Sequence, residues 1–518
     1  MRTDRLAVIQ GVSPDDDVHR NASEGYESLF GFADACATDE TWLRDATTGL
    51  SGTEVVERAS AISGQLAELG VGARTNVGLW MGNRVDYVVL ILAITRLGAC
   101  AVLLPTPTPA RLAGEYVDAA DIVFAIGDPE LLRRLPETGQ WSETGTVADS
   151  GITYRSALSH SSAEPATPTS TSAACIVFTS GTSGSPKPVV FSHRYILEVG
   201  HVIARSKGFV SRERLYLCTP LYHADALVSI VVTALLGGTL SIARRFSVSG
   251  FWSEAAQFEA TSFYYVGAIL ALLNKQCSRS SRYDGFRFAT GGGAPQVVAQ
   301  VFEERFRVPV LEAYSQTECM LCCSNTLNDR APGTVGKPYP GVEIRIVDES
   351  DSLRSRGEVG EILVRPPRPF VHFTEYYGDA PSTLEKCRNL FIRTGDLGLI
   401  DSSDRLRFHG RIGTSIRCRG ENVLPTHIEL LAEELPFVKS AAAVGIDSEY
   451  GDQDVLLLIS LADGSPSEAA AVRECARALP KPMRPRWVKI VGELPMTPTL
   501  KLARNQLPSV VPEGSVEV

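Results

Sequence analysis

The chain has 518 residues, of which 44% are hydrophobic and 21% charged, and its formal net charge is −10. This composition is typical of a globular protein, and the length predicts two or more domains. An acidic balance without a long basic run argues against nucleic acid as the main partner, and no apolar run approaches the roughly 18 residues of a membrane span. The first residues, MRTDRLAVIQGVSPDDD, lack the apolar core of a secretory signal, which favours a cytoplasmic protein.

Eleven cysteines are scattered along the chain, which favours reduced thiols over a disulfide framework. Cys319, Cys322 and Cys323 form one CxxCC cluster. Because no second pair and no histidine stands near this cluster in the sequence, the spacing does not favour a zinc site.

The first 45 residues show no clear periodicity, and we expect a loose leading segment there. Ser51 and Glu54 have the spacing of a capping box, and an apolar face then recurs at helical intervals up to Gly70. Strand-like and helical segments alternate after this helix, at 75–80, 83–98, 99–105 and 121–128. Such alternation predicts a layered α/β domain. A stretch rich in Ser, Thr, Ala and Pro, 156–172, is expected to be a surface loop.

The segment from Cys175 to His193, CIVFTSGTSGSPKPVVFSH, places a turn rich in glycine and hydroxyl residues between two short apolar runs. Glycines allow the backbone to approach a ligand, and successive N–H groups can bind an anion, so the turn favours a polyphosphate. The spacing differs from the P-loop motif GxxxxGK[ST], because Lys187 precedes a proline. A Ser/Gly linker is the alternative interpretation, although the flanking apolar runs argue against it. The residues expected to contact phosphate are Thr179, Ser180, Gly181, Thr182, Ser183, Gly184 and Lys187.

TSGTSGSPK resembles the TSGTTGxPKG loop of the adenylate-forming ligases, the superfamily of acyl-CoA synthetases, free-standing adenylation domains and luciferases. The resemblance implies an α/β fold in two parts. A large multi-layer N-terminal domain, 1–409, would bind ATP and the acid, and a small mobile C-terminal α/β domain, 410–518, would carry the catalytic lysine. The hinge between the two domains is expected near 410–414.

The segment CTPLYHAD resembles the family's PLFH segment, in which an aromatic residue and a histidine border the acid pocket. Tyr222 and His223 fall on those positions, and Gly291 is also expected to line the pocket. A family member that activates amino acids would carry an aspartate in place of His223, which makes an α-amino acid a less favoured substrate. His223, Tyr264 and Tyr265 favour an aromatic or short polar acid over a long acyl chain.

Two further segments resemble the nucleotide-binding motifs of the family. EAYSQTE, from Glu312 to Glu318, resembles YGxTE: Glu312 would bind the nucleotide, Tyr314 would stack on adenine, and Thr317 would face the α-phosphate. Glu318 would hold Mg²⁺ through a carboxylate oxygen. TGGGAP resembles the loop beside adenine, and its expected contacts are Gly292, Gly293, Ala294 and Pro295.

The remaining motifs lie towards the C-terminus. Asp396, in a TGD turn, would accept hydrogen bonds from the ribose hydroxyls, and Arg411 would also reach the ribose. Gly420 matches the glycine that lines the family's pantetheine channel. PMTPTLKLARNQL resembles PxTxxGKIxRxxL and places Lys501 at the family's catalytic lysine.

Some residues depart from the family pattern. Pro188 and Leu500 replace glycines and would stiffen or crowd places that the family keeps open. Gly413 replaces the hinge aspartate, and Ser315 adds a Cβ where the backbone would approach the ligand. The substitutions that keep the chemistry are Ser183 for threonine and Arg417 for lysine. These departures bear mainly on the second half-reaction, in which the activated acyl group passes to its acceptor.

The resemblance implies an AMP-forming acid ligase that uses ATP and Mg²⁺, releases pyrophosphate, and passes the acyl group to a thiol. That thiol would belong to coenzyme A or to the phosphopantetheine of an acyl-carrier protein, and the enzyme would be a monomer or homodimer. Two alternatives stay open. The acceptor could be an amine or another nitrogen nucleophile, or the chain could be a nucleotide-binding regulator without catalysis. The joint presence of Glu318, Asp396, Arg411 and Lys501 argues against the regulator.

Overall fold

The computed structural model describes residues 6–10, 26–136, 141, 143–147, 152–157, 164–180, 186–412, 416–418, 421–423, 425–448, 453–462, 464–480, 483–496 and 502–518. Contacts divide the chain into two compact units. The first comprises Met1–Arg345, Leu363–Thr394 and Ile400–Arg407, and the second comprises Ile346–Ile362, Gly395–Leu399 and Phe408–Val518. Both units combine helices and sheets, which confirms the α/β class, whereas the domain boundary between 409 and 410 stays a prediction.

A seven-stranded sheet forms one layer of the first unit, in the order β10-β9-β5-β4-β6-β8-β7. Its strands are β4 (Asn76–Trp80), β5 (Cys100–Leu103), β6 (Phe124–Gly127), β7 (Glu143–Val147), β8 (Ile152–Ser156), β9 (Ala173–Ser180) and β10 (Pro186–Ser192). The four strands β9, β5, β4 and β6 are parallel. Every residue of β4 and β5 is buried, as expected for parallel strands covered on both faces.

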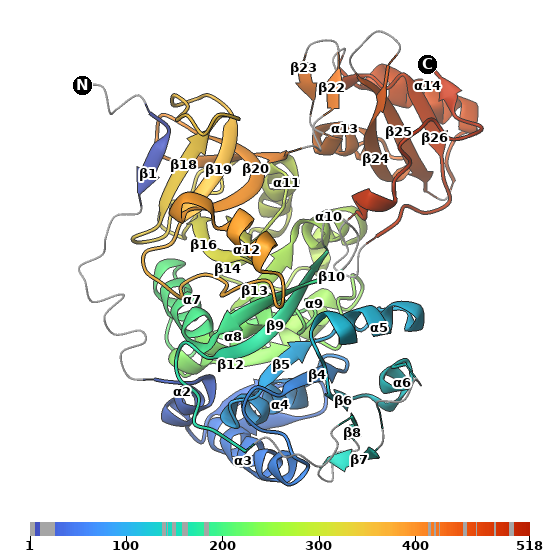
Figure 1. The fold of residues 1–518 in the computed structure, drawn as a ribbon. Helices are drawn as coiled ribbons and strands as arrows, with labels where there is room; N and C mark the ends of the chain where they lie inside the picture. The colour runs from blue at the N-terminus through green and yellow to red at the C-terminus, as the bar shows by residue number, and fades with distance from the viewer. Residues whose placement is uncertain are drawn as a thin grey trace. The chain divides into compact units, whose positions relative to one another are not determined.

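The helices of this layer are α3 (Gly52–Glu68), α4 (Val85–Arg96), α5 (Ala110–Ala119) and α6 (Pro129–Leu132), and Figure 1 shows α3 and α4 in blue beside β4 and β5. Of these, α3 and α4 lie where the sequence predicts, whereas α5 and α6 were not predicted. The capping box of α3 is formed, because the Ser51 hydroxyl accepts from the Glu54 amide while the Glu54 carboxylate accepts from the Ser51 amide. Gly70, with φ of 85°, follows the end of α3.

The second sheet of the first unit has nine strands, in the order β17-β16-β15-β14-β13-β11-β12-β2-β3. Its strands are β2 (Thr41–Arg44), β3 (Gly49–Ser51), β11 (Arg214–Leu217), β12 (Thr239–Ile242), β13 (Ser262–Val266), β14 (Phe288–Gly292), β15 (Val310–Gln316), β16 (Cys319–Ser324) and β17 (Lys337–Pro338). The strands from β12 to β15 are parallel, so that the carboxyl ends of β13, β14 and β15 lie together. This is the edge at which α/β sheets commonly bind ligands.

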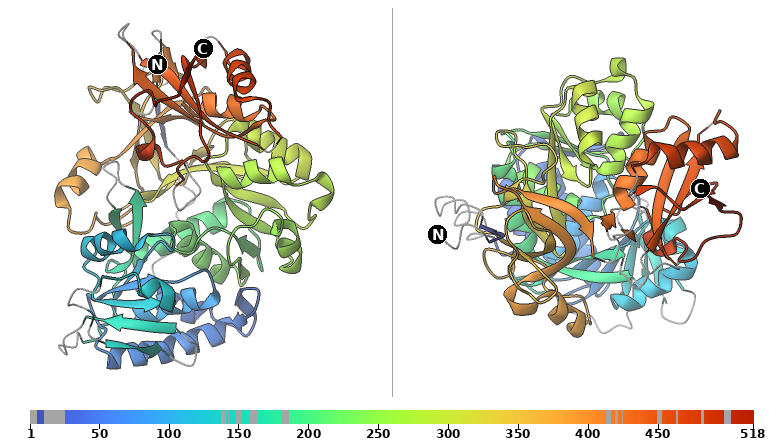
Figure 2. Two further views of the ribbon diagram at one scale, coloured as in Figure 1. Left: turned by 90° about the vertical axis from the view of Figure 1, so that its right-hand side faces the viewer. Right: turned by 90° about the horizontal axis from the view of Figure 1, so that it is seen from above.

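Helices cover both faces of the nine-stranded sheet. On one face, α9 (Phe251–Gln257), α10 (Gly267–Gln276) and α11 (Gln296–Phe306) pack on Tyr216, Phe263, Tyr265 and Ala289 in an aromatic core, and α10 and α11 are the yellow-green pair of Figure 2. Successive residues of a strand face opposite sides, so Leu217, Tyr264 and Thr290 point to the other face. There lie α7 (His193–Ser206) and α8 (Ala224–Leu235).

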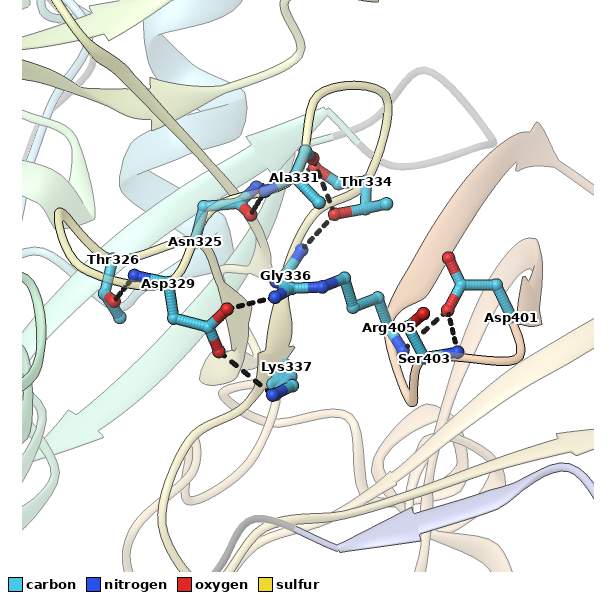
Figure 3. Close-up of polar contacts among 10 residues, drawn as sticks. All are labelled: Asn325, Thr326, Asp329, Ala331, Thr334, Gly336, Lys337, Asp401, Ser403 and Arg405. Atoms are coloured by element: carbon cyan, nitrogen blue, oxygen red, sulfur yellow. Dashed lines mark hydrogen bonds and ion pairs between the residues drawn. The ribbon is translucent and has the colours of Figure 1, made fainter.

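A third sheet has the order β1-β18-β19-β20-β21. Its strands are β1 (Val8–Gln10), β18 (Glu343–Val347), β19 (Gly360–Arg365), β20 (Ile392–Ile400) and β21 (Leu406–Arg411). Figure 3 shows the polar contacts that fix the loop between β16 and β17: the Ala331 amide donates to the Asn325 side chain at 2.9 Å, and Asp329 pairs with both Lys337 and Arg405. The loop is therefore held by side chains rather than by a strand ladder.

The C-terminal part of the second unit has a four-stranded sheet in the order β24-β25-β26-β27. Its elements are β22 (Ile416–Cys418), β23 (Glu421–Val423), α13 (Pro425–Glu433), β24 (Val438–Asp447), β25 (Gln453–Leu461), α14 (Glu468–Ala478), β26 (Trp487–Ile490) and β27 (Val516–Glu517). Ile428, Val455, Leu457 and Val472 belong to one buried cluster of this unit. These helices and strands give this part of the chain the α/β composition that the resemblance implies.

Two sequence expectations were wrong. Residues 26–45 are not a loose segment, because α2 (Leu29–Cys36) is capped by Ser28 and buries Phe32 and Ala33. At eight residues α2 is too short for a clear periodic pattern. The TGD residues, expected in a turn, lie within β20, where Gly395 adopts φ of 70° and so bends the strand without ending it.

Among the described residues, no helix combines the length and apolarity that a bilayer crossing requires.

The contact between α7 and α8 yields a prediction about stability. A Cβ built on Gly200 of α7 would lie 2.3 Å from Cγ1 of Val231 on α8, whereas one on exposed Gly64 of α3 would meet nothing within 4 Å. We expect Gly200→Ala to lower the free energy of unfolding by about 1–3 kcal/mol through overpacking. Gly64→Ala, the matched control, should raise it by about 0.5–1 kcal/mol. Urea midpoints that shift equally in both variants would contradict this.

Candidate functional site

The turn expected to bind phosphate joins two antiparallel strands, β9 and β10, as the sequence predicts. Thr179 and Lys187 face each other across this pair. The Lys187 ammonium lies 5.3 Å from the centre of the Tyr376 ring, a distance suited to a cation–π contact. Gly181, Thr182, Ser183 and Gly184 lie outside the described residues. The structure thus places one lysine and one aromatic ring at the base of the turn.

Pro188 lies on β10, the edge strand of the seven-stranded sheet. An edge strand tolerates proline because the missing N–H interrupts no ladder on the open side. The Pro188 carbonyl accepts a hydrogen bond from the Tyr377 amide at 2.9 Å, and Val190 exchanges hydrogen bonds with Thr374 and Glu375. The segment 374–377 therefore lies alongside β10 and brings Tyr376 to the site.

Tyr376 connects Glu318 to the base of the turn that is expected to bind phosphate, which we call the phosphate turn. Its hydroxyl donates to Oε1 of Glu318 at 2.5 Å, and the ammonium of Lys386, at the end of α12 (Ala380–Lys386), lies 4.0 Å from the same oxygen. Lys386 also donates to the Gln316 side chain at 2.9 Å. Only 9% of Glu318 is exposed. The site therefore holds one mostly buried carboxylate beside Tyr376 and Lys386, two residues that the sequence analysis missed.

The turn that carries Thr317 is fixed by a buried tyrosine. The hydroxyl of Tyr195, on α7, donates to the Thr317 carbonyl at 3.1 Å and accepts from the Met320 amide at 2.7 Å. Tyr314, on β15, is buried and pairs with Cys323 of β16. The backbone between Tyr314 and Glu318 is thus held from both sides, and its expected contacts with a nucleotide stay a prediction.

Glu312 holds the glycine loop that follows β14. Its Oε1 accepts from the Ala294 amide at 3.0 Å and its Oε2 accepts from the Tyr265 hydroxyl at 2.5 Å. Burial raises the pKa of the Glu312 carboxyl to about 7, although these hydrogen bonds and the nearby Lys207 oppose the shift. Glu312 therefore acts in this structure as a tether of the loop from the side facing α10.

The glycines of the loop have steric reasons to be glycine. A Cβ on Gly291 would lie 2.0 Å from the Tyr265 carbonyl oxygen, and one on Gly292 would lie 2.9 Å from the Ala313 carbonyl oxygen. Gly293 has φ of 79°, and Pro295 is the N-cap of α11. Structural packing alone thus accounts for much of TGGGAP, and its contact with adenine stays a prediction.

On the acid side, Tyr222 and His223 immediately precede α8. Tyr222 is buried, His223 is the N-cap of the helix, and the centres of the two rings are 4.7 Å apart. Tyr264 of β13 and Thr290 of β14 are register partners, and Gly291 is the next residue along β14. Tyr264, Thr290 and Gly291 lie near the carboxyl ends of neighbouring strands, and Tyr222 and His223 lie in the loop between β11 of the same sheet and α8.

Asp396 and Arg411, the residues expected to bind the ribose, both belong to the second unit. Nε of Arg411 lies 3.8 Å from Oδ1 of Asp396, whose side chain is largely buried. The Ile412 amide donates to the Gly395 carbonyl at 2.8 Å, which holds the two segments together. Gly420, Gly413, Leu500 and Lys501 lie outside the described residues, so the roles expected for Gly420 and Lys501 stay predictions.

Comparison with known proteins supports the same interpretation. A sequence profile described as AMP-binding enzyme matches residues 32–377, and one described as AMP-binding enzyme C-terminal domain matches residues 427–501. The chain belongs to the AMP-binding enzyme family. The second match ends at Lys501, in the segment that resembles the family's catalytic motif.

Characterised relatives cover most of the chain. It is 28% identical to the medium/long-chain-fatty-acid–CoA ligase FadD6 of Mycobacterium tuberculosis, over 97% of this chain and 89% of that protein. It is 29% identical to the sulfoacetate–CoA ligase of Cupriavidus necator, over 87% and 90%. The structure of the O-succinylbenzoate coenzyme A synthetase of Bacillus subtilis with AMP superposes with a TM-score of 0.79 at 22% identity, over 93% and 98%, which confirms the expected fold.

The raised pKa of Glu312 predicts a pH-dependent stability. Between the ordinary value of 4.5 and about 7, the unfolded chain loses this proton while the folded chain keeps it, so the free energy of unfolding falls as pH rises. Glu312→Gln lacks this titration. Its free energy of unfolding, relative to the wild type, should therefore rise across that window by an amount on the order of 3 kcal/mol.

Urea unfolding from pH 4.5 to 7.5 measures this difference. Glu304→Gln removes an exposed carboxylate from α11 and serves as the control. If the curves of Glu304→Gln and Glu312→Gln ran parallel, the burial of Glu312 would not be the cause.

Proposed function

We propose that the chain is an AMP-forming acid–thiol ligase. It joins a carboxylate to the α-phosphate of ATP with release of pyrophosphate, and then passes the acyl group to a thiol with release of AMP. The observation that carries this proposal is the arrangement of Lys187, Tyr376, Glu318 and Lys386. The first three lie within residues 32–377, the region that matches the AMP-binding family. Relatives named as CoA ligases, aligned over most of the chain, support coenzyme A as the acceptor.

The first half-reaction brings two anions together, so the site must supply positive charge. A unit charge 4 Å from another is worth about 4 kcal/mol at an effective dielectric of 20. Lys187 lies at the base of the phosphate turn and Lys386 beside Glu318, where each can neutralise negative charge on the nucleotide. Lys501 is the residue that we assign to the reacting carboxylate and α-phosphate, on its motif alone.

Glu318 suits Mg²⁺. An Mg²⁺ ion in a phosphoryl-transfer site uses one or two carboxylates together with phosphate oxygens, and no larger His, Cys, Asp and Glu cluster appears among the described residues. Tyr376 orients the Glu318 carboxylate, and the Lys386 ammonium lies 4.0 Å from the same oxygen. Mg²⁺ held by Glu318 would neutralise phosphate charge and polarise the phosphoryl oxygens.

The remaining roles are assigned by motif. We assign Thr179, Ser180, Thr317 and Tyr314 to the nucleotide, Asp396 and Arg411 to its ribose, and Gly420 to the pantetheine arm. Residues 1–409 would form the adenylation domain and residues 410–518 the mobile domain. The phosphopantetheine of a carrier protein is the alternative acceptor to coenzyme A. We also propose a cytoplasmic location and a monomeric or homodimeric state.

Acid-dependent exchange between ATP and radioactive pyrophosphate tests the first half-reaction. We expect exchange with one group among aryl, short polar, alkyl and amino acids. Mass analysis of products, with coenzyme A and an amine offered together, then identifies the acceptor. A protein that binds ATP but exchanges with no acid would be a regulator, and an amide product would move the enzyme to the nitrogen-acceptor alternative.

Lys501→Ala tests the catalytic lysine. Because it removes one charged stabiliser of the transition state, we expect exchange to fall roughly 100-fold or more while ATP binding stays largely intact. Equilibrium binding of a fluorescent ATP analogue provides the comparison. Near-normal pyrophosphate release in this variant would remove Lys501 from the mechanism.

Tyr376→Phe tests the link between the phosphate turn and Glu318. The substitution removes a hydrogen bond to a carboxylate, worth about 1.5–3 kcal/mol, so we expect exchange to fall about 10–100-fold. Tyr377→Phe is the matched control, because the Tyr377 hydroxyl donates to exposed Asp121 at 3.2 Å. Equal losses in the two variants would assign the effect to the fold of segment 374–377 rather than to Glu318.

A further inference from the structure

Lys207 is a buried cation that the reaction above does not use. It is the C-cap residue of α7 and is 2% exposed. Its ammonium donates to the Thr290 hydroxyl at 2.7 Å. An ammonium has three N–H donors. Within the described part of the chain, Lys207 uses one of them in a hydrogen bond to a side chain, that of Thr290. A buried cation with donors to spare is costly unless another acceptor completes its contacts.

The surroundings of Lys207 are charged but do not pair with it closely. Asp225 and Glu312 both favour its charged form, whereas burial lowers the pKa of the ammonium to about 8. Lys207 therefore keeps its charge at neutral pH. Asp225 lies in the first turn of α8, two residues after His223, so this cation lies beside the segment assigned to the acid pocket.

A second unsatisfied donor lies on the same side of the sheet. Tyr264 and Thr290 are register partners on the parallel strands β13 and β14, so their side chains point to one face. The Tyr264 hydroxyl is buried and has no hydrogen-bond partner among the residues that the structure describes. Asp225 acts electrostatically on Tyr264 as well as on Lys207, which places all three groups in one neighbourhood.

We propose that Lys207 and Tyr264 form a polar end of the acid pocket and bind a second polar group of the substrate. This inference rests on the proposed function. Both residues offer N–H or O–H donors, so the group that they recognise is a hydrogen-bond acceptor: a carbonyl, a hydroxyl or a second acidic group. The substrate is then a short or aromatic acid that carries such an acceptor, and an alkyl chain of equal length is rejected.

The cost of leaving buried donors unpaired determines which substrates the pocket favours. A hydrocarbon placed against Lys207 and Tyr264 would leave their donors buried and unpaired, whereas an acceptor would satisfy them. Sites built to hydrogen-bond a substrate reject the analogue that lacks the polar group far more strongly than apolar pockets reject an extra one. The relatives do not decide between these classes, because one is named for fatty acids and another for sulfoacetate.

The experiment compares matched pairs of acids in the pyrophosphate-exchange assay: pentanoate with 4-oxopentanoate, pentanoate with glutarate, and benzoate with 4-hydroxybenzoate. For at least one pair, we expect the wild type to favour the polar member at least 10-fold in kcat/KM. Lys207→Met, which keeps the length of the side chain, should lower this ratio about 10–100-fold. Tyr264→Phe, the milder variant, should lower the same ratio about 10-fold. It keeps the inference testable if Lys207→Met fails to fold.

Lys439→Met, which removes an exposed lysine, is the control and should leave the ratio unchanged. A uniform loss with both members of each pair, or a wild type that prefers the alkyl acid, would overturn the inference and leave the proposed function standing. Absence of exchange with every acid, in protein that binds ATP, would overturn the proposed function and the inference with it.

Discussion

The hydrogen bond from Tyr376 to Glu318 is the constraint on which the candidate site depends. It joins the segment 374–377 to the turn between β15 and β16, and backbone hydrogen bonds join the same segment to strand β10. Because Glu318 is largely buried, its carboxylate needs close partners, and Tyr376 and Lys386 provide them. The position of the carboxylate is thereby fixed before any nucleotide arrives, which is the preorganisation that electrostatic catalysis requires.

The glycine loop after β14 is held by a second pair of buried groups. Lys207 contacts Thr290, where the loop begins, and Glu312 accepts from the Ala294 amide four residues later. The two groups approach the sheet from opposite faces, and burial raises the pKa of the Glu312 carboxyl to about 7, so it keeps its proton in the folded chain below that pH. Hydrogen bonds, rather than an ion pair, therefore support the loop.

Local patterns in the sequence predicted much of this structure. The capping box at Ser51 and the strands on both sides of the phosphate turn depend on neighbours within a few residues, so local patterns reveal them. Tyr376 and Lys207 are different, because they contact residues 58 and 83 positions away. No spacing rule encodes such contacts, since only the packing of whole strands brings them together. The short helix α2 was missed for the opposite reason, because eight residues give too little repeat to recognise.

The pairing of segment 374–377 with β10 has a consequence for solubility. Edge strands expose unpaired backbone groups that can recruit another chain, and proteins commonly cover them or interrupt them with proline. Here both devices occur: Pro188 removes one donor from β10, while Thr374, Glu375 and Tyr377 engage the Val190 and Pro188 backbone. The segment that carries the tyrosine of the site thus also closes this side of the sheet to intermolecular strand addition.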